Sequence, residues 1–98
     1  MTIRGTEIPV KFWYQVLETT VSAAYYGEPV KFHRIIRKYQ QYFSTDKNSY
    51  RSHIGVYSYH SRFGRYQVRD MCLDIIKTIG WNEEDWCLFC SDTENNGI

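Results

Sequence analysis

The middle of the chain is rich in the types of side chain that bind a nucleic-acid strand. Lysine and arginine bind phosphates, which supply most of the nonspecific affinity, and tyrosine rings stack on unpaired bases. We therefore expect residues 31–69 to contact single-stranded or structured RNA or DNA. The residues expected to hold phosphates are Lys31, Arg34, Lys38, Arg51, Arg62, Arg65 and Arg69, and those expected to stack on bases are Tyr57, Tyr59 or Tyr66.

The charge of the chain is strongly polarised. Residues 31–69 contain nine of the twelve Lys and Arg residues and one acidic residue, Asp46, so their formal charge is +8. Residues 70–98 have a formal charge of −6, and the whole chain has a charge of only +1. A concentrated positive surface attracts polyanions. The alternative for a basic helix face is an ordinary solvated exterior, which any soluble helix needs.

The acidic end supports a second interpretation. Trp81, Trp86 and Phe89 lie among carboxylates, and aromatic anchors with a polar rim are typical of protein interfaces. The chain would then be a small protein-binding regulator or inhibitor of a nucleic-acid-handling enzyme, with its basic surface on an acidic protein. The acidic end could also pair with the basic end of another copy, giving a homodimer. Alternatively, the three rings simply cover the core.

The histidines suggest a third function, a small metal-independent ribonuclease. His33, His53 and His60 lie among cations and tyrosines, and a histidine pair beside arginine can cleave RNA by general acid–base chemistry. A surface or half-buried histidine is much commoner, and no catalytic motif frames these three. We therefore assign no catalytic residue and favour a non-enzymatic module.

Two further groups have the residue types of metal ligands. Asp70 and Asp74 share a helix face, and Cys87 and Cys90 form a CxxC motif with Cys72 as a further thiolate. Lys77 makes a solvated charged face the better interpretation of the aspartates. Buried free cysteines are common, and the gap in the CxxC is Leu-Phe rather than a ligand turn. We predict no metal and no cofactor.

Helical periodicity predicts the elements that position these residues. Apolar residues recur at helical spacing over residues 9–26 and again over 28–43, where cations occupy the opposite face. A third helix follows from Val68 and ends at Gly80. Asn82 is a suitable N-cap for a short helix at the acidic residues after it. Residues 86–90 either continue that helix or form an edge strand.

Residues 50–69 allow two structures. Segments 53–59 and 65–69 are rich in β-branched and aromatic residues, and 61–64 could turn a short hairpin between them. The alternative is a helix that begins near Ser58. In that case a helix or loop from Ser58 to Arg69 could enter the groove of a duplex.

Together these patterns predict an α+β fold dominated by three to four helices, with an all-α fold as the alternative. We expect one domain over residues 1–98, with 91–98 as a flexible tail. Because no signal peptide, membrane span or disulfide framework is visible, we expect a cytoplasmic protein. A small, Tyr-rich chain without a catalytic motif resembles proteins encoded by phages and other mobile elements.

Overall fold

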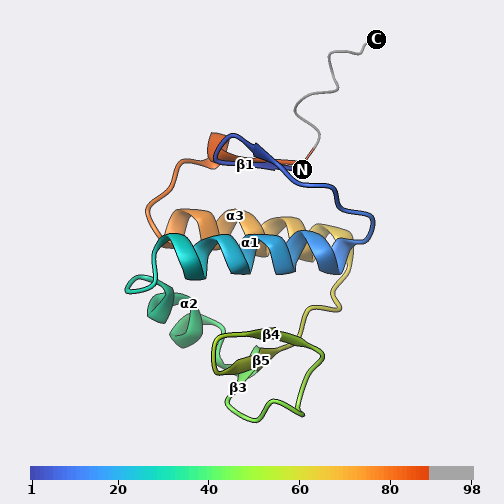
Figure 1. The fold of residues 1–98 in the computed structure, drawn as a ribbon, viewed down its shortest axis with the longest axis vertical. Helices are drawn as coiled ribbons and strands as arrows, with labels where there is room; N and C mark the ends of the chain where they lie inside the picture. The colour runs from blue at the N-terminus through green and yellow to red at the C-terminus, as the bar shows by residue number, and fades with distance from the viewer. Residues whose placement is uncertain (89–98) are drawn as a thin grey trace.

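The computed structural model describes residues 1–88, and these form three layers (Figure 1). Two parallel helices, α1 (Trp13–Gly27) and α3 (Arg65–Thr78), make the central layer. One sheet, of strand order β2-β1-β6, covers one side of this layer. A second sheet, of order β3-β5-β4, lies with helix α2 (Phe32–Lys38) on the other side. This arrangement confirms the predicted α+β class, and the all-α alternative is wrong.

The strands within residues 1–88 are short and pair in antiparallel fashion. The first sheet consists of β1 (Thr2–Ile3), β2 (Thr6–Glu7) and β6 (Trp86–Cys87). The second consists of β3 (Phe43–Ser44), β4 (Ser52–Ile54) and β5 (Tyr57–Tyr59). Short 3₁₀ helices, η1 (Gln40–Tyr42) and η2 (Glu83–Asp85), precede β3 and β6. The sequence did not predict β1 and β2, because two-residue strands are too short to show alternation.

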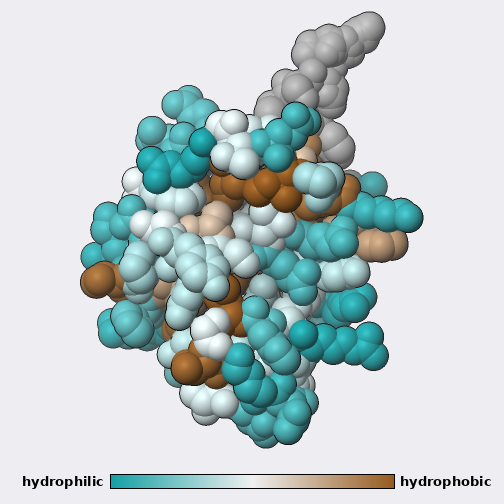
Figure 2. Space-filling view, in the orientation of Figure 1, coloured by the Kyte–Doolittle hydropathy of each residue, from teal (hydrophilic) through white to brown (hydrophobic). Residues whose placement is uncertain are grey.

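Helix α1 begins later than its periodicity predicted. The predicted start was Pro9, but the helix begins at Trp13. The side chain of Gln15 caps its N-terminus. Gln15 Oε1 accepts hydrogen bonds from the backbone N–H groups of Lys11 and Phe12, at 2.7 and 3.0 Å. Residues 8–12 instead form a non-helical arm, and its Ile8 and Val10 side chains pack against the core. Figure 2 shows part of an apolar band between the first sheet and the helices.

Helix α2 ends at Lys38, whereas the sequence predicted a helix up to Phe43. Phe43 is a strand residue instead. It pairs with Tyr59 across β3 and β5, and the two rings stack with centroids 5.2 Å apart. Cross-strand aromatic pairing therefore overrides a helical pattern that is correct only as far as residue 38.

Residues 50–69 contain a hairpin, but not where the sequence placed it. Strands β4 and β5 are joined by a two-residue turn at Gly55-Val56, and Gly55 has a left-handed φ of +57°. Glycine adopts this conformation without the strain that a β-carbon would add. The predicted turn at 61–64 is a linker without regular secondary structure, and α3 begins at Arg65 where a second strand was predicted. The alternative of a helix from Ser58 is therefore also wrong.

Buried polar contacts hold the layers in register. Ser52 of β4 donates to the Glu18 carboxylate of α1 (2.6 Å), and its Oγ lies 2.5 Å from that of Ser61 in the linker. On the opposite side of the helices, Trp86 Nε1 donates to Thr20 Oγ1 at 2.8 Å. Because a buried polar group must find a partner, these contacts restrict how each sheet packs against α1. They also fix the linker between β5 and α3.

Candidate nucleic-acid interface

The N-termini of α1 and α3 lie at the same end of the molecule (Figure 1). This follows from their parallel orientation, because the chain returns through α2 and the second sheet before α3 begins. Neither helix has an acidic residue in its first turn. Two helix dipoles therefore add partial positive charge to this end and no carboxylate of those turns opposes it.

Exposed cations gather around these helix ends. Arg62 lies in the linker, Arg65 and Arg69 lie in the first turns of α3, and Lys11 precedes α1. None of the four forms an ion pair with a carboxylate of residues 1–88. Arg51 joins them through a small hollow described below. We call these five cations, together with the rings of Tyr14 and Tyr66, the arginine end.

Two of the guanidinium groups lie on aromatic rings. The Arg62 guanidinium is 4.1 Å from the centroid of the Tyr14 ring, and that of Arg65 is 4.8 Å from the centroid of Tyr66. Arg65 also donates a hydrogen bond of 3.1 Å to the Tyr66 hydroxyl. Stacking restrains each arginine without neutralising it. The groups are therefore positioned and still available to phosphate.

A small hollow extends the arginine end toward the second sheet. It has a volume of about 200 Å³, and Arg51, Arg62 and His60 are among its lining residues. His60 packs against the rings of Tyr50 and Phe63, with centroids 5.8 and 4.6 Å away. Two arginines bordering one hollow form a suitable anchor for a phosphate group.

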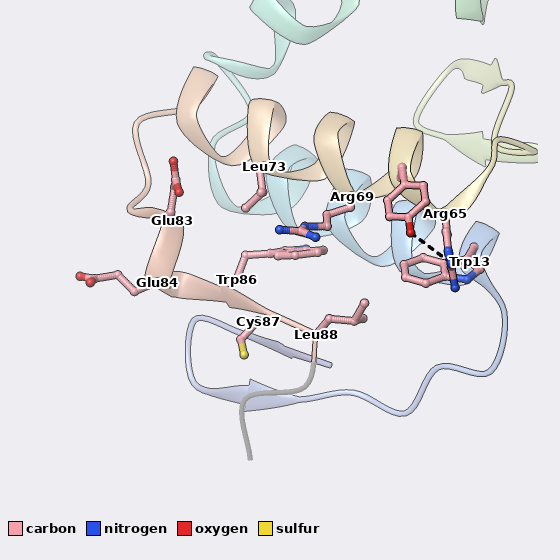
Figure 3. A pocket seen from close by; sticks show the side chains of 10 residues that line it. Trp13, Arg65, Arg69, Leu73, Glu83, Glu84, Trp86, Cys87 and Leu88 are labelled. Carbon is pink, nitrogen blue, oxygen red and sulfur yellow. Dashed lines mark hydrogen bonds between the residues drawn. The ribbon is translucent and has the colours of Figure 1, made fainter. Parts of the chain in front are cut away.

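A larger groove lies on the other side of the arginine end, beside α3 (Figure 3). It has a volume of about 640 Å³. Figure 3 shows the Arg69 guanidinium over the Trp86 side chain, with Trp13 and Arg65 toward one end. Glu83 and Glu84 lie toward the other end. An apolar floor beside two arginines offers space for an unstacked base next to its phosphate.

The structure brings together four of the seven cations that the sequence proposed. Arg51, Arg62, Arg65 and Arg69 belong to the arginine end, whereas the other three lie on or beside α2. Lys38 is in an ion pair with Asp74 (2.7 Å), and Lys31 is 3.9 Å from Glu28. Arg34 is exposed on α2 and forms no ion pair within residues 1–88.

The Lys38 pair belongs to a structural cluster. The Tyr39 hydroxyl donates a short hydrogen bond to the second Asp74 oxygen. Although burial alone would raise the pKa of Asp74, hydrogen bonds from Lys38 and Tyr39 outweigh it and hold the pKa below its usual value. Burial and the Asp74 contact raise the pKa of Tyr39 above its usual range. The cluster therefore holds α2 against α3, and Lys38 is paired with Asp74 within it.

The three predicted stacking tyrosines have different environments. Tyr66 is 65% exposed and belongs to the arginine end, as a stacking residue requires. Tyr59 is only 2% exposed, so its prediction as a stacking residue is wrong. It points inward from β5, and this burial raises its pKa. Tyr57 is half-buried and lines a different hollow, against α2.

The predicted aromatic patch at the acidic end is contradicted for one of its three residues, Trp86. Trp86 is buried, so it is a core residue rather than a contact residue. Trp81 packs over Gly27, accepts the Arg4 guanidinium on its ring at 4.3 Å, and donates to Glu28. Phe89 lies outside the described residues. The prediction of a partner surface centred on these three residues therefore fails for Trp86.

The histidines are not assembled as a pair. In residues 1–88, no hydrogen bond or ring contact joins one histidine to another. His53 Nε2 lies 3.0 Å from the carbonyl of Lys47 and 3.2 Å from that of Tyr50, while His33 lies on α2. No contact within residues 1–88 therefore supports the acid–base pair of the ribonuclease hypothesis, which stays an untested alternative.

The described cysteines and carboxylates form no cluster of metal ligands within residues 1–88. Cys72 is buried, and burial raises the pKa of its thiol to about 12. Its Sγ lies 3.9 Å from the Val16 carbonyl, so it fills the contact between α1 and α3. Cys87 is half-buried, and Cys90 lies beyond the described part of the chain.

Sequence reasoning missed Lys11 and Tyr14, which lie before and within α1. Both come from the N-terminal third, outside the basic segment. The parallel packing of α1 and α3 brings the Tyr14 ring to Arg62 and places Lys11 at the same end of the molecule. No local pattern indicates such a long-range contact.

Comparisons with protein-family models, curated proteins and solved structures gave no match. None of the helices between residues 1 and 88 is long and apolar enough to span a bilayer.

Proposed function

We propose that the chain binds single-stranded nucleic acid at its arginine end. The observation that carries this proposal is the pairing of guanidinium groups with aromatic rings. Arg62 lies over Tyr14 and Arg65 over Tyr66, without a carboxylate partner in residues 1–88. Arginine beside accessible rings is the chemistry by which proteins hold a sugar–phosphate strand and stack its bases.

The strand would follow the order of the cations along the linker. Its phosphates would lie first at the hollow between Arg51 and Arg62, then at Arg65, and then at Arg69 beside the groove. The helix N-termini strengthen phosphate binding without reading the sequence. Bases would stack on Tyr66 and on Phe12, which is 50% exposed.

The exposed rings favour a single strand over a duplex. A paired base already stacks on its neighbours, so it offers its edge and not its face to a protein ring. Nearly all of the contacts just described go to phosphates or to the faces of bases. We therefore expect weak sequence preference and a strong dependence of affinity on salt.

The test is a fluorescence-anisotropy titration of a labelled single strand of about 12 nucleotides, across a salt series. With three to four phosphates bound, log K should fall against log salt with a slope of about −2 to −3. Arg62→Ala with Arg65→Ala should weaken binding by about 10- to 100-fold and reduce that slope by about 1.4. A duplex of the same length should bind more weakly.

The matched control removes two arginines from the other end of the molecule. Arg34→Ala with Arg37→Ala changes the net charge equally, and both side chains are exposed on α2. This variant should lose less than about threefold in affinity, because only long-range attraction is reduced. Equal losses in the two variants would show that net charge, not the arginine end, binds the strand. Absence of binding at low salt would reject the proposal outright.

A further inference from the structure

A second hollow lies at the opposite end of the molecule, where the C-terminus of α1, helix α2 and the β4–β5 turn meet. Its volume is about 370 Å³, and most of its walls are aromatic. The lining includes Tyr25, Tyr26, Pro29, His33, Val56 and Tyr57. We call it the tyrosine hollow. It takes no part in the nucleic-acid interface proposed above.

Exposed apolar side chains surround the tyrosine hollow. Tyr26 is 75% exposed, Val30 is 81% exposed, and Val56 is 66% exposed. Figure 2 shows an apolar side chain that protrudes at the connection between α1 and α2. Aliphatic groups beside aromatic rings are typical of surfaces that receive a protein side chain. A nucleic-acid strand gains little from aliphatic groups.

Two cations lie beside the hollow, although neither is among its lining residues. Arg37 follows His33 by four residues on α2, so the two share a face of that helix. Lys47 Nζ donates to the Gly55 carbonyl at 2.7 Å, which holds it at the turn that carries Val56. Among residues 1–88, no acidic residue lines the hollow. The neighbouring Glu28 contacts Lys31 and Trp81 instead.

This charge pattern selects among possible occupants. A second copy placed face to face would bring these two cations toward the same two cations of the other copy, which is unfavourable. A segment rich in Asp and Glu would instead complement Arg37 and Lys47 beside the hollow, while one apolar side chain fills the aromatic interior. We infer that the tyrosine hollow docks an acidic protein segment through a single apolar anchor residue.

The test uses a defined peptide in which one Phe is flanked on both sides by Asp and Glu. Binding is followed by NMR through the methyl signals of Val30 and Val56 in the intact chain. At millimolar concentrations the peptide should shift both methyl signals. A peptide with Ala in place of Phe, and one with Lys in place of the acidic residues, should leave them unchanged.

Paired variants separate this docking site from the nucleic-acid interface. Arg37→Glu should lower the affinity for the acidic peptide at least about fivefold, which is close to 1 kcal/mol at 1.4 kcal/mol per tenfold. Arg34→Glu makes the same charge change on α2 but away from the His33 face, and should alter binding less than twofold. The Arg62→Ala, Arg65→Ala variant should bind the peptide normally, so failure of the proposed function would not affect this result.

Three results would overturn the inference. The first is that the acidic peptide leaves both valine methyl signals unchanged at millimolar concentrations. The second is that Arg37→Glu and Arg34→Glu lower the affinity for the peptide equally. The third is that the single strand used above, and not the peptide, shifts these methyl signals, which would make the hollow a second base-binding site.

Discussion

Two lysines beside α2 and two arginines of the arginine end have the same formal charges but different surroundings. Lys38 is in contact with Asp74, and Lys31 lies near Glu28. Arg62 and Arg65 lie on tyrosine rings instead. A carboxylate neutralises its cation, whereas a ring orients a guanidinium and leaves its charge in place. Availability to a polyanion therefore depends on the partner of each cation rather than on the density of charge in the sequence.

The same comparison separates structural from functional roles. The Asp74 cluster joins two helices, so its loss should affect folding. The stacked arginines lie at the surface of the helix ends, so their loss should affect binding and leave folding nearly unchanged. Removing each kind of partner in turn tests this division.

The largest effect on stability should follow from Asp74→Ala. This change removes the acceptor of both Lys38 and Tyr39, and should lower the free energy of unfolding by about 1–2 kcal/mol. The measurement is urea denaturation followed by circular dichroism. Because Lys38 is released, binding of the single strand should not weaken.

Asp70→Ala is the matched control for this experiment. Asp70 precedes Asp74 by one helical turn and is exposed, and its side chain makes no hydrogen bond or ion pair within residues 1–88. Its loss should change the free energy of unfolding by less than about 0.5 kcal/mol. Equal destabilisation by the two variants would mean that the Asp74 cluster has no special role in holding α2.

The fold class and the buried apolar face of α3 were predictable because they depend on local patterns. Val68, Cys72, Ile75, Ile76 and Ile79 recur at helical spacing and are all buried. The end of α2 was not predictable, because Phe43 continues the helical pattern while its partner Tyr59 lies in a later strand. Pairing between distant segments is not encoded in the periodicity of either one.

The binding site was predictable only in part, for the same reason. Residue type correctly selected arginine and tyrosine, but it did not distinguish Tyr59 from Tyr66. One points into the core from β5 and the other lies exposed on α3. Tyr14 lies outside the basic segment, and only the parallel packing of α1 and α3 places it under Arg62. Sequence composition therefore indicates the chemistry, and the fold decides which residues supply it.

A smaller effect should follow when the ring beneath an arginine is removed. Tyr14→Leu keeps an apolar side chain on α1 but removes the aromatic face that orients Arg62. A cation–π contact at an accessible site contributes about 0.5–1 kcal/mol, so affinity for the single strand should fall by about two- to fivefold. The salt slope should stay the same, because no charge is lost.

Tyr26→Leu is the control for this change, because Tyr26 is an exposed α1 tyrosine without a cation over its ring in residues 1–88. It should leave strand affinity unchanged. If Tyr14→Leu were equally silent, Arg62 would bind phosphate without help from the ring. The contrast between paired and stacked cations would then have no consequence for binding.

The subtlest test removes the carboxylate charge by pH instead of mutation. The pKa of Asp74 is lower in the folded chain than its ordinary value of 3.8, because Lys38 and Tyr39 stabilise the carboxylate against the opposing effect of burial. Its contribution to stability is therefore complete above that ordinary value. The contribution is lost as the pH falls through the lower pKa of the folded state.

The measurement compares the wild-type chain with Asp74→Asn by urea denaturation at neutral pH and at successively lower pH. The wild type should be the more stable at neutral pH, and the difference should shrink as the pH falls below 3.8, because a protonated Asp resembles Asn. A difference that stays constant in acid would show that the charge of Asp74 contributes nothing. Lys38 would then be as available to a polyanion as Arg62, contrary to the division drawn between the two ends of the molecule.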